Sequence, residues 1–493
     1  MRYLLGIDLG AGSLKATIIN PNGQMLGEAS CPMTTHIPQP GFAEQNPADW
    51  RAALGIAVPA CLAATAIKAP EIAGISVSAG AHIPVLMDAS GAVIRPAIMW
   101  SDQRSTAQAQ ALHAKAGAMI TQTSLNRINP TWTLAMLAWL QKHEPASIAR
   151  TEKLFLAKDY LRYCLTGTWE SDYSDAIGTL MADDATKNWS PEICALIGWN
   201  MATLPPIKPA TAIVGGVSAQ AAALTGLAPG TPVICGANDT TVEFFGVGGI
   251  APGMGAVKLA TAGVLFLATQ GKSVHPPVSC YPHIIEGLYY TATGTNSCAS
   301  AHRWLRDTMF ATGGFAEMDA LAATIPPGSN GLLFHPYLQG ERAPYWDPHL
   351  RADFIGLTIA HTRAHFARAL YEGIAFSIRD VLQAAQALGL HYGTIRLMGG
   401  GAKSATWRQI IADVTGLAVE VMENTDASFG AALLAGIGVG VFATAEDAVA
   451  QCVRPLAACT PNPTIHALYS NQFEIYKDAQ AALAPISHRL GSV

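Results

Sequence analysis

The stretch that decides the fold is residues 3–19, YLLGIDLGAGSLKATII. Residues 3–7 and 15–19 are apolar and rich in strand-forming side chains, and the segment between them is rich in glycine. A third extended segment, residues 24–30, follows after a short turn. The pattern predicts an antiparallel strand pair whose connecting loop carries Asp8.

A similar layout occurs in the second half of the chain. Residues 255–260 and 264–269 are apolar segments joined by the turn Thr261-Ala262-Gly263. Because a layout repeated about 250 residues apart indicates internal symmetry, we expect each half to be built on a similar sheet.

The other periodic segments predict a mixed α/β fold. Strand-like runs occur at residues 72–77, 85–88, 231–236 and 395–398, and helical spacing occurs at 105–118, 133–143, 238–246, 362–388 and 405–415. In the longest of these helices, Phe366, Leu370, Ile374 and Ile378 lie four residues apart and form one apolar face.

Length and composition favour two domains. A chain of 493 residues exceeds what one hydrophobic core usually supports. We expect residues 1–246 to form an N-terminal domain and residues 247–493 a C-terminal domain. Glycine and proline cluster at residues 246–253, which we interpret as the boundary and a hinge, with an ordinary turn as the alternative.

Several classes of protein are disfavoured. The net charge of -5, without a basic run, argues against a nucleic-acid partner. Nine scattered cysteines without a CxxC pair predict free thiols rather than disulfides or a zinc site. Residues 427–445 are uncharged but contain four glycines, so we expect a buried helix rather than a membrane span. Asp8 interrupts the apolar start, and we expect a cytoplasmic protein.

The first loop has the composition of a phosphate site. A carboxylate at Asp8 could hold hydrated Mg²⁺ against phosphates, while Gly10 and Gly12 allow backbone N–H groups to approach phosphate oxygens. Ser13 and Lys15 add donors. An ordinary hairpin turn is the alternative.

Asp239, in the segment GANDT at residues 236–240, is the candidate general base. In phosphoryl transfer to an alcohol, a carboxylate accepts the hydroxyl proton and orients the nucleophile. Alternatively, Asp239 is an acidic residue favoured by the dipole of a helix N-terminus. The two roles are compatible.

Two further turns are candidate nucleotide contacts. The turn GGGAKS at residues 399–404 joins a strand to a helix, and the small residues Gly400, Gly401 and Ala402, followed by Lys403, let a nucleoside lie against the backbone. Thr261 and Gly263 offer a hydroxyl and N–H groups to phosphates. Plain turns are the alternative, and neither a P-loop nor a GxGxxG fingerprint is present.

Sugar contacts are expected at two places. His82 follows a strand in a loop rich in glycine and alanine, and Trp100, Asp102 and Arg104 combine an aromatic ring with two charges. A structural histidine and a surface ion pair are the alternatives. The stretch GERAPYWDP at residues 340–348 has a similar mixture, with a structured loop as the alternative.

These motifs, in this order, resemble the FGGY family of carbohydrate kinases, and within it the xylulokinases. The resemblance covers about residues 3–445 and includes DLGAGSLK, WSDQR, GANDT, GERAPYWDP, ADFIGLTIAHTRAHFARALYE and GGGAKSATWRQ. It implies two ribonuclease-H-like domains that bind Mg-ATP and a sugar. It also implies phosphorylation of D-xylulose to D-xylulose 5-phosphate, with Asp239 as the base and Asp8 on the magnesium side.

The sequence departs from the xylulokinase pattern mainly in the sugar pocket. Ala81 precedes His82 where methionine is usual, and Thr240 follows the base where asparagine is usual. Kinases for ribulose, another ketose or glycerol therefore stay as alternatives, and so does a non-catalytic, actin-like ATP-binding protein. We expect a sugar and ATP/ADP as partners, and neither nucleic acid nor membrane. Homodimer formation is left open.

Overall fold

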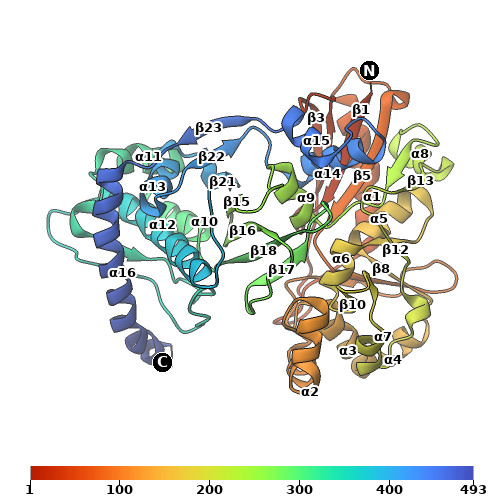
Figure 1. Cartoon of the computed structure of the whole chain (residues 1–493), viewed down its shortest axis with the longest axis horizontal. Coiled ribbons are helices and arrows are strands. Elements are labelled where there is room, and N and C mark those ends of the chain that lie inside the picture. The colour runs from red at the N-terminus through yellow and green to blue at the C-terminus, as the bar shows by residue number, and fades with distance from the viewer. Residues whose placement is uncertain (1, 492–493) are drawn as a thin grey trace. The chain divides into compact units, whose positions relative to one another are not determined.

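The computed structural model describes residues 2–491, which form two compact units. Of the described residues, 2–250, 270–290 and 424–453 form the first unit, and 251–269, 291–423 and 454–491 form the second. Each unit is built on one large sheet (Figure 1).

The first sheet has the strand order β13-β14-β5-β1-β2-β3. Its strands are β1 (Tyr3–Leu9), β2 (Ser13–Ile19), β3 (Met25–Pro32), β5 (Ile72–Ala79), β13 (Ile213–Gly216) and β14 (Pro232–Ile234). Strand β1 pairs antiparallel with β2 and parallel with β5. The strand pair predicted from residues 3–19 is therefore confirmed.

The second sheet has the order β17-β18-β16-β15-β21-β22-β23. Its strands are β15 (Gly255–Leu259), β16 (Gly263–Gln270), β17 (Ser279–Pro282), β18 (Leu288–Thr295), β21 (Ile395–Met398), β22 (Val419–Met422) and β23 (Pro455–Cys459). Strand β15 pairs antiparallel with β16 and parallel with β21, as β1 does with β2 and β5. The outer strands β14 and β13 correspond in direction to β22 and β23. The two sheets thus follow one plan, as the repeated layout predicts.

Helices cover both faces of the first sheet. The helices of the first unit are α1 (Pro47–Ala63), α2 (Thr106–Ser124), α3 (Thr133–His143), α4 (Pro145–Ala149), α5 (Ala157–Thr166), α6 (Tyr173–Gly178), α7 (Pro191–Leu196), α8 (Ala219–Thr225), α9 (Asp239–Gly246), α14 (Ala427–Gly438) and α15 (Ala445–Cys452). Leu5, Ile7 and Leu9 of β1 share one buried cluster with Trp50 and Leu54 of α1. Strand β1 alternates its side chains between two apolar layers, because its other face meets α14.

The contact between β1 and α14 depends on glycine. A Cβ atom at Gly6 would lie 1.8 Å from the carbonyl oxygen of Ser428, so only glycine allows the helix backbone to approach the strand. The neighbouring strand β2 contacts the same helix, because the hydroxyl group of Thr17 lies 2.8 Å from that of Ser428 in α14. In Figure 1, α14 (blue) accordingly lies beside the red strands of the N-terminal sheet.

The core of the second unit is centred on a long helix. Its helices are α10 (Ala299–Met309), α11 (Gly314–Thr324), α12 (Arg363–Ala387), α13 (Ala405–Thr415) and α16 (Pro463–Leu490). Leu370, Ile374 and Ile378 of α12 are buried in this core, and Phe366 packs against it. The predicted helix over residues 362–388 and its apolar face are confirmed.

Smaller elements complete the chain. They are the strands β4 (Glu44–Gln45), β6 (Pro84–Met87), β7 (Ala97–Ile98), β8 (Lys153–Leu156), β9 (Ser171–Asp172), β10 (Ala182–Asp183), β11 (Asn188–Trp189), β12 (Ile207–Lys208), β19 (Leu333–His335) and β20 (Asp353–Ile355). All nine cysteines are free thiols, as expected. Among the helices of residues 2–491, none has the length and apolar character that a membrane span requires.

The compact units do not coincide with a single cut of the chain. Residues 270–290 and 424–453 group by their contacts with the first unit, although both segments follow residue 246. The domain division 1–246 and 247–493, with its hinge at 246–253, stays a prediction.

We predict that Gly6→Ala lowers the free energy of unfolding by about 1–3 kcal/mol, because the added methyl group overpacks the contact between β1 and α14. Denaturant unfolding measures this difference. Gly393→Ala is the control, since its Cβ would lie at an ordinary 3.5 Å from the Gly253 oxygen. Equal effects of the two changes would contradict the proposed role of Gly6.

Candidate functional site

Asp239 is the first residue of α9 and is half-buried. Its Oδ1 accepts hydrogen bonds from the Thr240 amide at 2.7 Å and from the Thr240 hydroxyl at 3.1 Å. The Asn238 side chain caps the helix by accepting from the Thr241 amide at 2.9 Å. The structure thus places Asp239 at a helix N-terminus, where the helix dipole favours the ionised carboxylate.

A row of stacked rings lies beside Asp239. The ring centroids of His82 and Trp132 are 4.8 Å apart, those of Trp132 and Tyr281 are 6.0 Å apart, and those of Tyr281 and Tyr290 are 5.4 Å apart. The pKa values of both tyrosines are raised, chiefly by burial, and the charge of Asp239 adds to the effect. The same row of rings therefore connects His82 with the surroundings of Asp239, although more than 150 residues separate the two in the sequence.

His82 is held firmly in an unusual backbone conformation. Its φ angle of 51° lies in the left-handed region. Its amide donates to Asp175 Oδ1 at 2.6 Å, and its carbonyl accepts from the Thr133 hydroxyl at 2.5 Å. Ring atom Nδ1 is buried and has no partner among the described residues. Burial lowers the pKa of His82 to about 4, so the ring is a neutral hydrogen-bonding group at pH 7.

Asp175 is a buried acid next to His82. Burial raises its pKa well above the usual value, and the charges of Asp159 and Asp172 add to this, while Lys158 opposes it. The amide of His82 occupies Oδ1, and Oδ2 is buried without a partner among the described residues. The sequence analysis missed Asp175, Trp132 and the two tyrosines, since nothing in their local sequence distinguishes them from core residues.

A buried charge network supports α6, the helix that carries Asp175. The Lys158 ammonium lies 2.5 Å from Asp159 Oδ1 and 2.8 Å from Asp172 Oδ1, and all three side chains are buried. Asp172 caps α6, and the Ser174 carbonyl accepts from the Asn238 side chain at 3.0 Å. Hydrogen bonds therefore connect this network to the cap of α9, and hence to the position of Asp239.

Asp102 and Arg104 form an internal pair. Their side chains are only 1% and 2% exposed, which contradicts the alternative of a surface ion pair. Arg104 also contacts Glu44 at 2.7 Å and lies over the ring of Phe42. Arg104 thus pairs with Asp102 and Glu44, and Asp102 also accepts from the Ala43 amide, so the pair stabilises the surrounding loops. Its role in sugar binding stays a prediction.

Two predicted sugar contacts lie at the surface near His82. Trp100 is half-exposed, and its ring approaches Gly80. Ala81, between Gly80 and His82, is partly exposed. The loop before His82 and the Trp100 ring are therefore neighbours and can line one pocket.

Asp8 lies near the end of β1, opposite Lys15 of β2. Asp8 Oδ1 accepts from the Ser78 hydroxyl at 2.7 Å. The Gly10 amide closes the turn by donating to the Ser13 carbonyl at 3.0 Å, and a Cβ at Gly12 would meet nothing within 4 Å. The loop is thus open on the side of Gly12, as close approach of a phosphate requires.

The Lys15 ammonium is directed to carboxylates. It lies 3.2 Å from Asp426 and 3.3 Å from Glu28. Partial burial disfavours its charge, but these two carboxylates outweigh burial and raise the pKa of Lys15. A phosphate role for Lys15, which stays a prediction, would require it to leave these partners.

The fit of a magnesium ion depends on Asp8. Within residues 2–491 no group of three or more His, Cys, Asp or Glu side chains could hold a metal by itself. Mg²⁺ usually keeps several waters and binds one or two carboxylates together with substrate phosphates. One half-buried carboxylate beside an open glycine turn fits that mode of binding.

The candidate nucleotide turns lie together in the second unit. The turn at residues 261–263 follows β15, and Gly400–Lys403 follows β21 as a short 3-10 turn. Parallel strands β15 and β21 end at the same edge of the sheet, and a Cβ at Gly399 would lie 2.8 Å from the Leu259 oxygen. Arg303, which the sequence analysis did not select, donates to the Thr261 hydroxyl at 3.0 Å.

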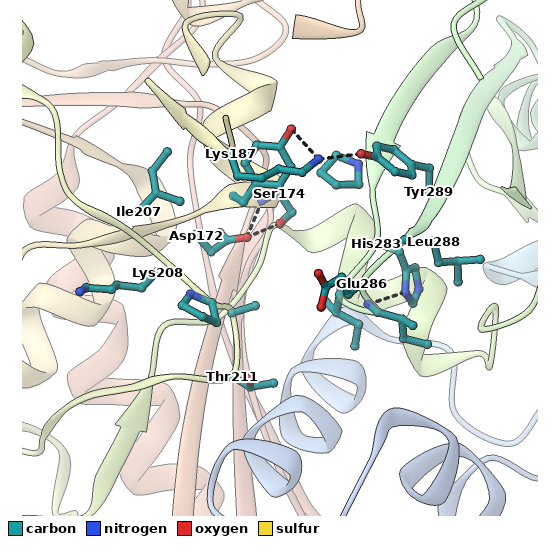
Figure 2. Close-up of a pocket in the computed structure, with 17 residues that line it drawn as sticks. Asp172, Ser174, Lys187, Ile207, Lys208, Thr211, His283, Glu286, Leu288 and Tyr289 are labelled. Atoms are coloured by element: carbon teal, nitrogen blue, oxygen red, sulfur yellow. Dashed lines mark hydrogen bonds between the residues drawn. The ribbon is translucent and has the colours of Figure 1, made fainter. Parts of the chain in front are cut away.

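A cavity of 410 Å³ lies next to the site in the first unit (Figure 2). The hairpin turn between β17 and β18 lines one side, and Ser174 and residues 207–211 line the other. At its edge, the Lys187 ammonium contacts Tyr289 and Asp184, each at 2.6 Å. Ser174 separates this cavity from the Asn238 cap.

Comparison with known proteins decides the family. Residues 3–246 match the N-terminal domain of the FGGY family of carbohydrate kinases, and residues 257–439 match its C-terminal domain. The chain belongs to this family. The prediction of two ribonuclease-H-like domains is thereby confirmed, and so is the prediction of a phosphotransferase that acts on a carbohydrate.

Individual relatives match over nearly the whole chain. A xylulose kinase of Bacillus subtilis is 34% identical over 97% of this chain and 96% of its own length. An L-xylulose/3-keto-L-gulonate kinase of Escherichia coli is 30% identical over 99% of both chains. The crystal structure of xylulose kinase from Rhodospirillum rubrum is similar with a TM-score of 0.90 and 30% identity, covering 99% of this chain and 100% of that chain.

We predict that His82 makes the first unit less stable in acid. Its pKa is about 4 when folded and about 6.5 when unfolded, so the unfolded state binds more protons below pH 6.5. The contribution of neutral His82 to the free energy of unfolding is therefore fully present above pH 6.5 and is lost as the pH drops towards 4. At pH 5 this loss amounts to about 2 kcal/mol.

His82→Phe should abolish that part of the pH dependence, because a phenyl ring keeps the stacking on Trp132 but cannot titrate. Denaturant unfolding at pH 7 and pH 5 measures the difference for both proteins. An equal loss in the two proteins would show that His82 is already charged in the folded state.

Proposed function

We propose that this chain transfers the γ-phosphoryl group of ATP to a terminal hydroxyl of a ketopentose, with D-xylulose as the preferred substrate. The observation that carries the proposal is the position of Asp239, at a helix N-terminus beside the row of rings that includes His82. The family and the xylulose kinases at 34% and 30% identity support the reaction and the substrate.

In the proposed reaction, Asp239 accepts the proton of the attacking hydroxyl group. A bond forms between that oxygen and the γ-phosphorus, the bond from the γ-phosphorus to the β–γ bridging oxygen breaks, and ADP leaves. The neutral His82 ring, Ala81, Trp100 and Thr240 orient the sugar. The amides of the 261–263 turn and of Gly400–Lys403, with Gly10, Gly12, Ser13 and Lys15, hold the nucleotide.

Magnesium belongs to the same proposal. When bound, Mg²⁺ neutralises charge on the phosphates. In this chain Asp8 would hold it on the first loop, with Ser78 fixing the orientation of the carboxylate by its 2.7 Å hydrogen bond. We further propose a cytoplasmic enzyme, and homodimer formation stays open.

A second candidate substrate is another ketose. It is favoured by the pocket residues Ala81 and Thr240, which differ from the usual xylulokinase pattern, and by the similarity to an L-xylulose/3-keto-L-gulonate kinase. A smaller residue at position 81 leaves more room beside His82. The non-catalytic alternative is disfavoured, because a pure ATP switch does not need a general base.

We predict that Asp239→Ala lowers kcat by about 10²-fold to 10⁴-fold, because no carboxylate then takes the proton from the sugar hydroxyl group. A coupled ADP assay measures kcat, and calorimetry should show that nucleotide binding is largely kept. Asp447→Ala is a matched control, since Asp447 also lies in the first turn of a helix, α15, and is not among the candidate site residues. Full activity of the Asp239 variant would exclude the proposed mechanism.

A panel of pentuloses, hexuloses and polyols should identify the sugar. We expect strong turnover only with a ketopentose, and the highest kcat/KM with D-xylulose. Ala81→Met should sharpen that preference by restoring the usual wall beside His82. Equal turnover with glycerol, or strong ATP hydrolysis without any sugar, would contradict the assignment.

A further inference from the structure

The stretch at residues 340–348, which the proposed reaction does not use, forms a closed loop in the second unit. Glu341 and Asp347 exchange two backbone hydrogen bonds of 2.9 Å, so the loop is pinned at both sides. The Glu341 side chain points inward and is only 2% exposed. A buried carboxylate is costly unless it has specific partners, and its partners therefore indicate its role.

Residues 341–343 hold residues 294–296 at the end of β18. Glu341 Oε1 accepts from the Asn296 amide at 2.6 Å, the Arg342 guanidinium donates to the Thr295 carbonyl at 3.0 Å, and the Ala343 amide donates to the Gly294 carbonyl at 3.2 Å. Glu341 Oε1 also accepts from the Arg342 amide at 2.7 Å. Each residue of one segment thus fixes one residue of the other.

The segment held in this way packs against the 261–263 turn. A Cβ at Gly294 would lie 2.0 Å from the Gly263 oxygen, and a Cβ at Gly263 would lie 2.9 Å from the Thr295 hydroxyl. Next along the chain, the Cys298 amide donates to the Thr261 carbonyl at 3.1 Å. Because two of these contacts join backbone to backbone, the turn cannot shift without residues 294–298.

We propose that Glu341 is a positioning residue for the 261–263 turn and acts through its hydrogen bond to the Asn296 amide. Its carboxylate oxygens bond to protein groups, namely the Asn296 and Arg342 amides and the Ser377 hydroxyl. Only the consequence for nucleotide binding rests on the proposed function, which assigns this turn to the phosphates.

The ionisation of Glu341 makes the inference testable by pH. Burial raises the pKa of Glu341 to about 7, although the two amides and Arg342 lower it. Oε1 is occupied by the two amides, so the proton goes to Oε2, where the Ser377 hydroxyl lies at 3.5 Å. Ionised Glu341 therefore holds the Asn296 amide more strongly than protonated Glu341 does, because hydrogen bonds to a charged acceptor are stronger.

Within residues 2–491, the other titratable and charged groups around Glu341 come from its own loop, the start of α10, α12 and α16. They are Arg342 and Tyr345 of the same loop, Cys298 before α10, Asp380 of α12 through Tyr345, and Tyr476 of α16. Burial raises the pKa of Cys298 to about 12, and the pKa values of both tyrosines are raised as well. Burial also raises the pKa of Asp380, which reaches Glu341 only through Tyr345. With a pKa of about 7, Glu341 changes charge between pH 6 and 8.

The first experiment measures the turn itself. Hydrogen exchange of the peptide that contains residues 259–265 is followed in the wild type, in Glu341→Gln and in Glu341→Ala. Glu341→Gln keeps the shape and an acceptor but removes the charge, so we expect faster exchange at pH 8, and faster still with alanine. Glu474→Gln, on the exposed side of α16, is the control and should not alter this peptide.

The second experiment measures Mg-ADP affinity by calorimetry between pH 6 and 8. The nucleotide titrates too, so wild type and Glu341→Gln are compared at each pH. We expect the wild type to bind several-fold more tightly than the variant at pH 8 and with equal affinity at pH 6.

The two measurements separate the possible failures. Unchanged exchange at residues 259–265 in both variants would overturn the positioning role of Glu341. Faster exchange with unchanged affinity would uphold that role and instead contradict the assignment of this turn to the phosphates. Faster exchange together with the pH-dependent loss of affinity would support both.

Discussion

The whole structure depends on one pairing pattern, in which the first strand of an antiparallel pair also pairs in parallel with a strand that follows a helix. In the first unit β1 takes this central place between β2 and β5, and in the second unit β15 takes it between β16 and β21. Parallel strands end at the same edge of a sheet, and ligands of open α/β sheets bind at that edge. The loops after the central strands therefore carry the candidate site residues.

Close backbone approach makes this arrangement rigid. Gly6 lets α14 lie directly on β1, and Gly263 and Gly294 let β16 and β18 approach at the 261–263 turn. At each place a side chain would separate the two backbones. Glycine thus has a packing role at these places, in addition to the phosphate contacts that we propose for the loops.

The proposed sugar site combines neutral and charged groups in a defined way. His82 is buried and uncharged at pH 7, and burial raises the pKa of Asp175 well above its usual value, whereas Asp239 lies at a helix N-terminus that favours its ionised form. A base must be ionised to accept a proton, and the groups that orient hydroxyls need not be. The Lys158 network stabilises this arrangement of neutral and ionised groups, because it holds α6 and, through Asn238, the start of α9.

The sequence by itself determined the fold class, the repeated sheet and the candidate loops, because strand periodicity, glycine turns and helix caps are local signals. It also selected Asp8, His82 and Asp239. Only the tertiary structure brought Trp132, Asp175, Tyr281 and Tyr290 together with His82 and Asp239, and only it showed that Asp102 and Arg104 form a buried pair. These residues meet through contacts between distant segments, and neither burial nor ring stacking across such distances leaves a pattern in the local sequence.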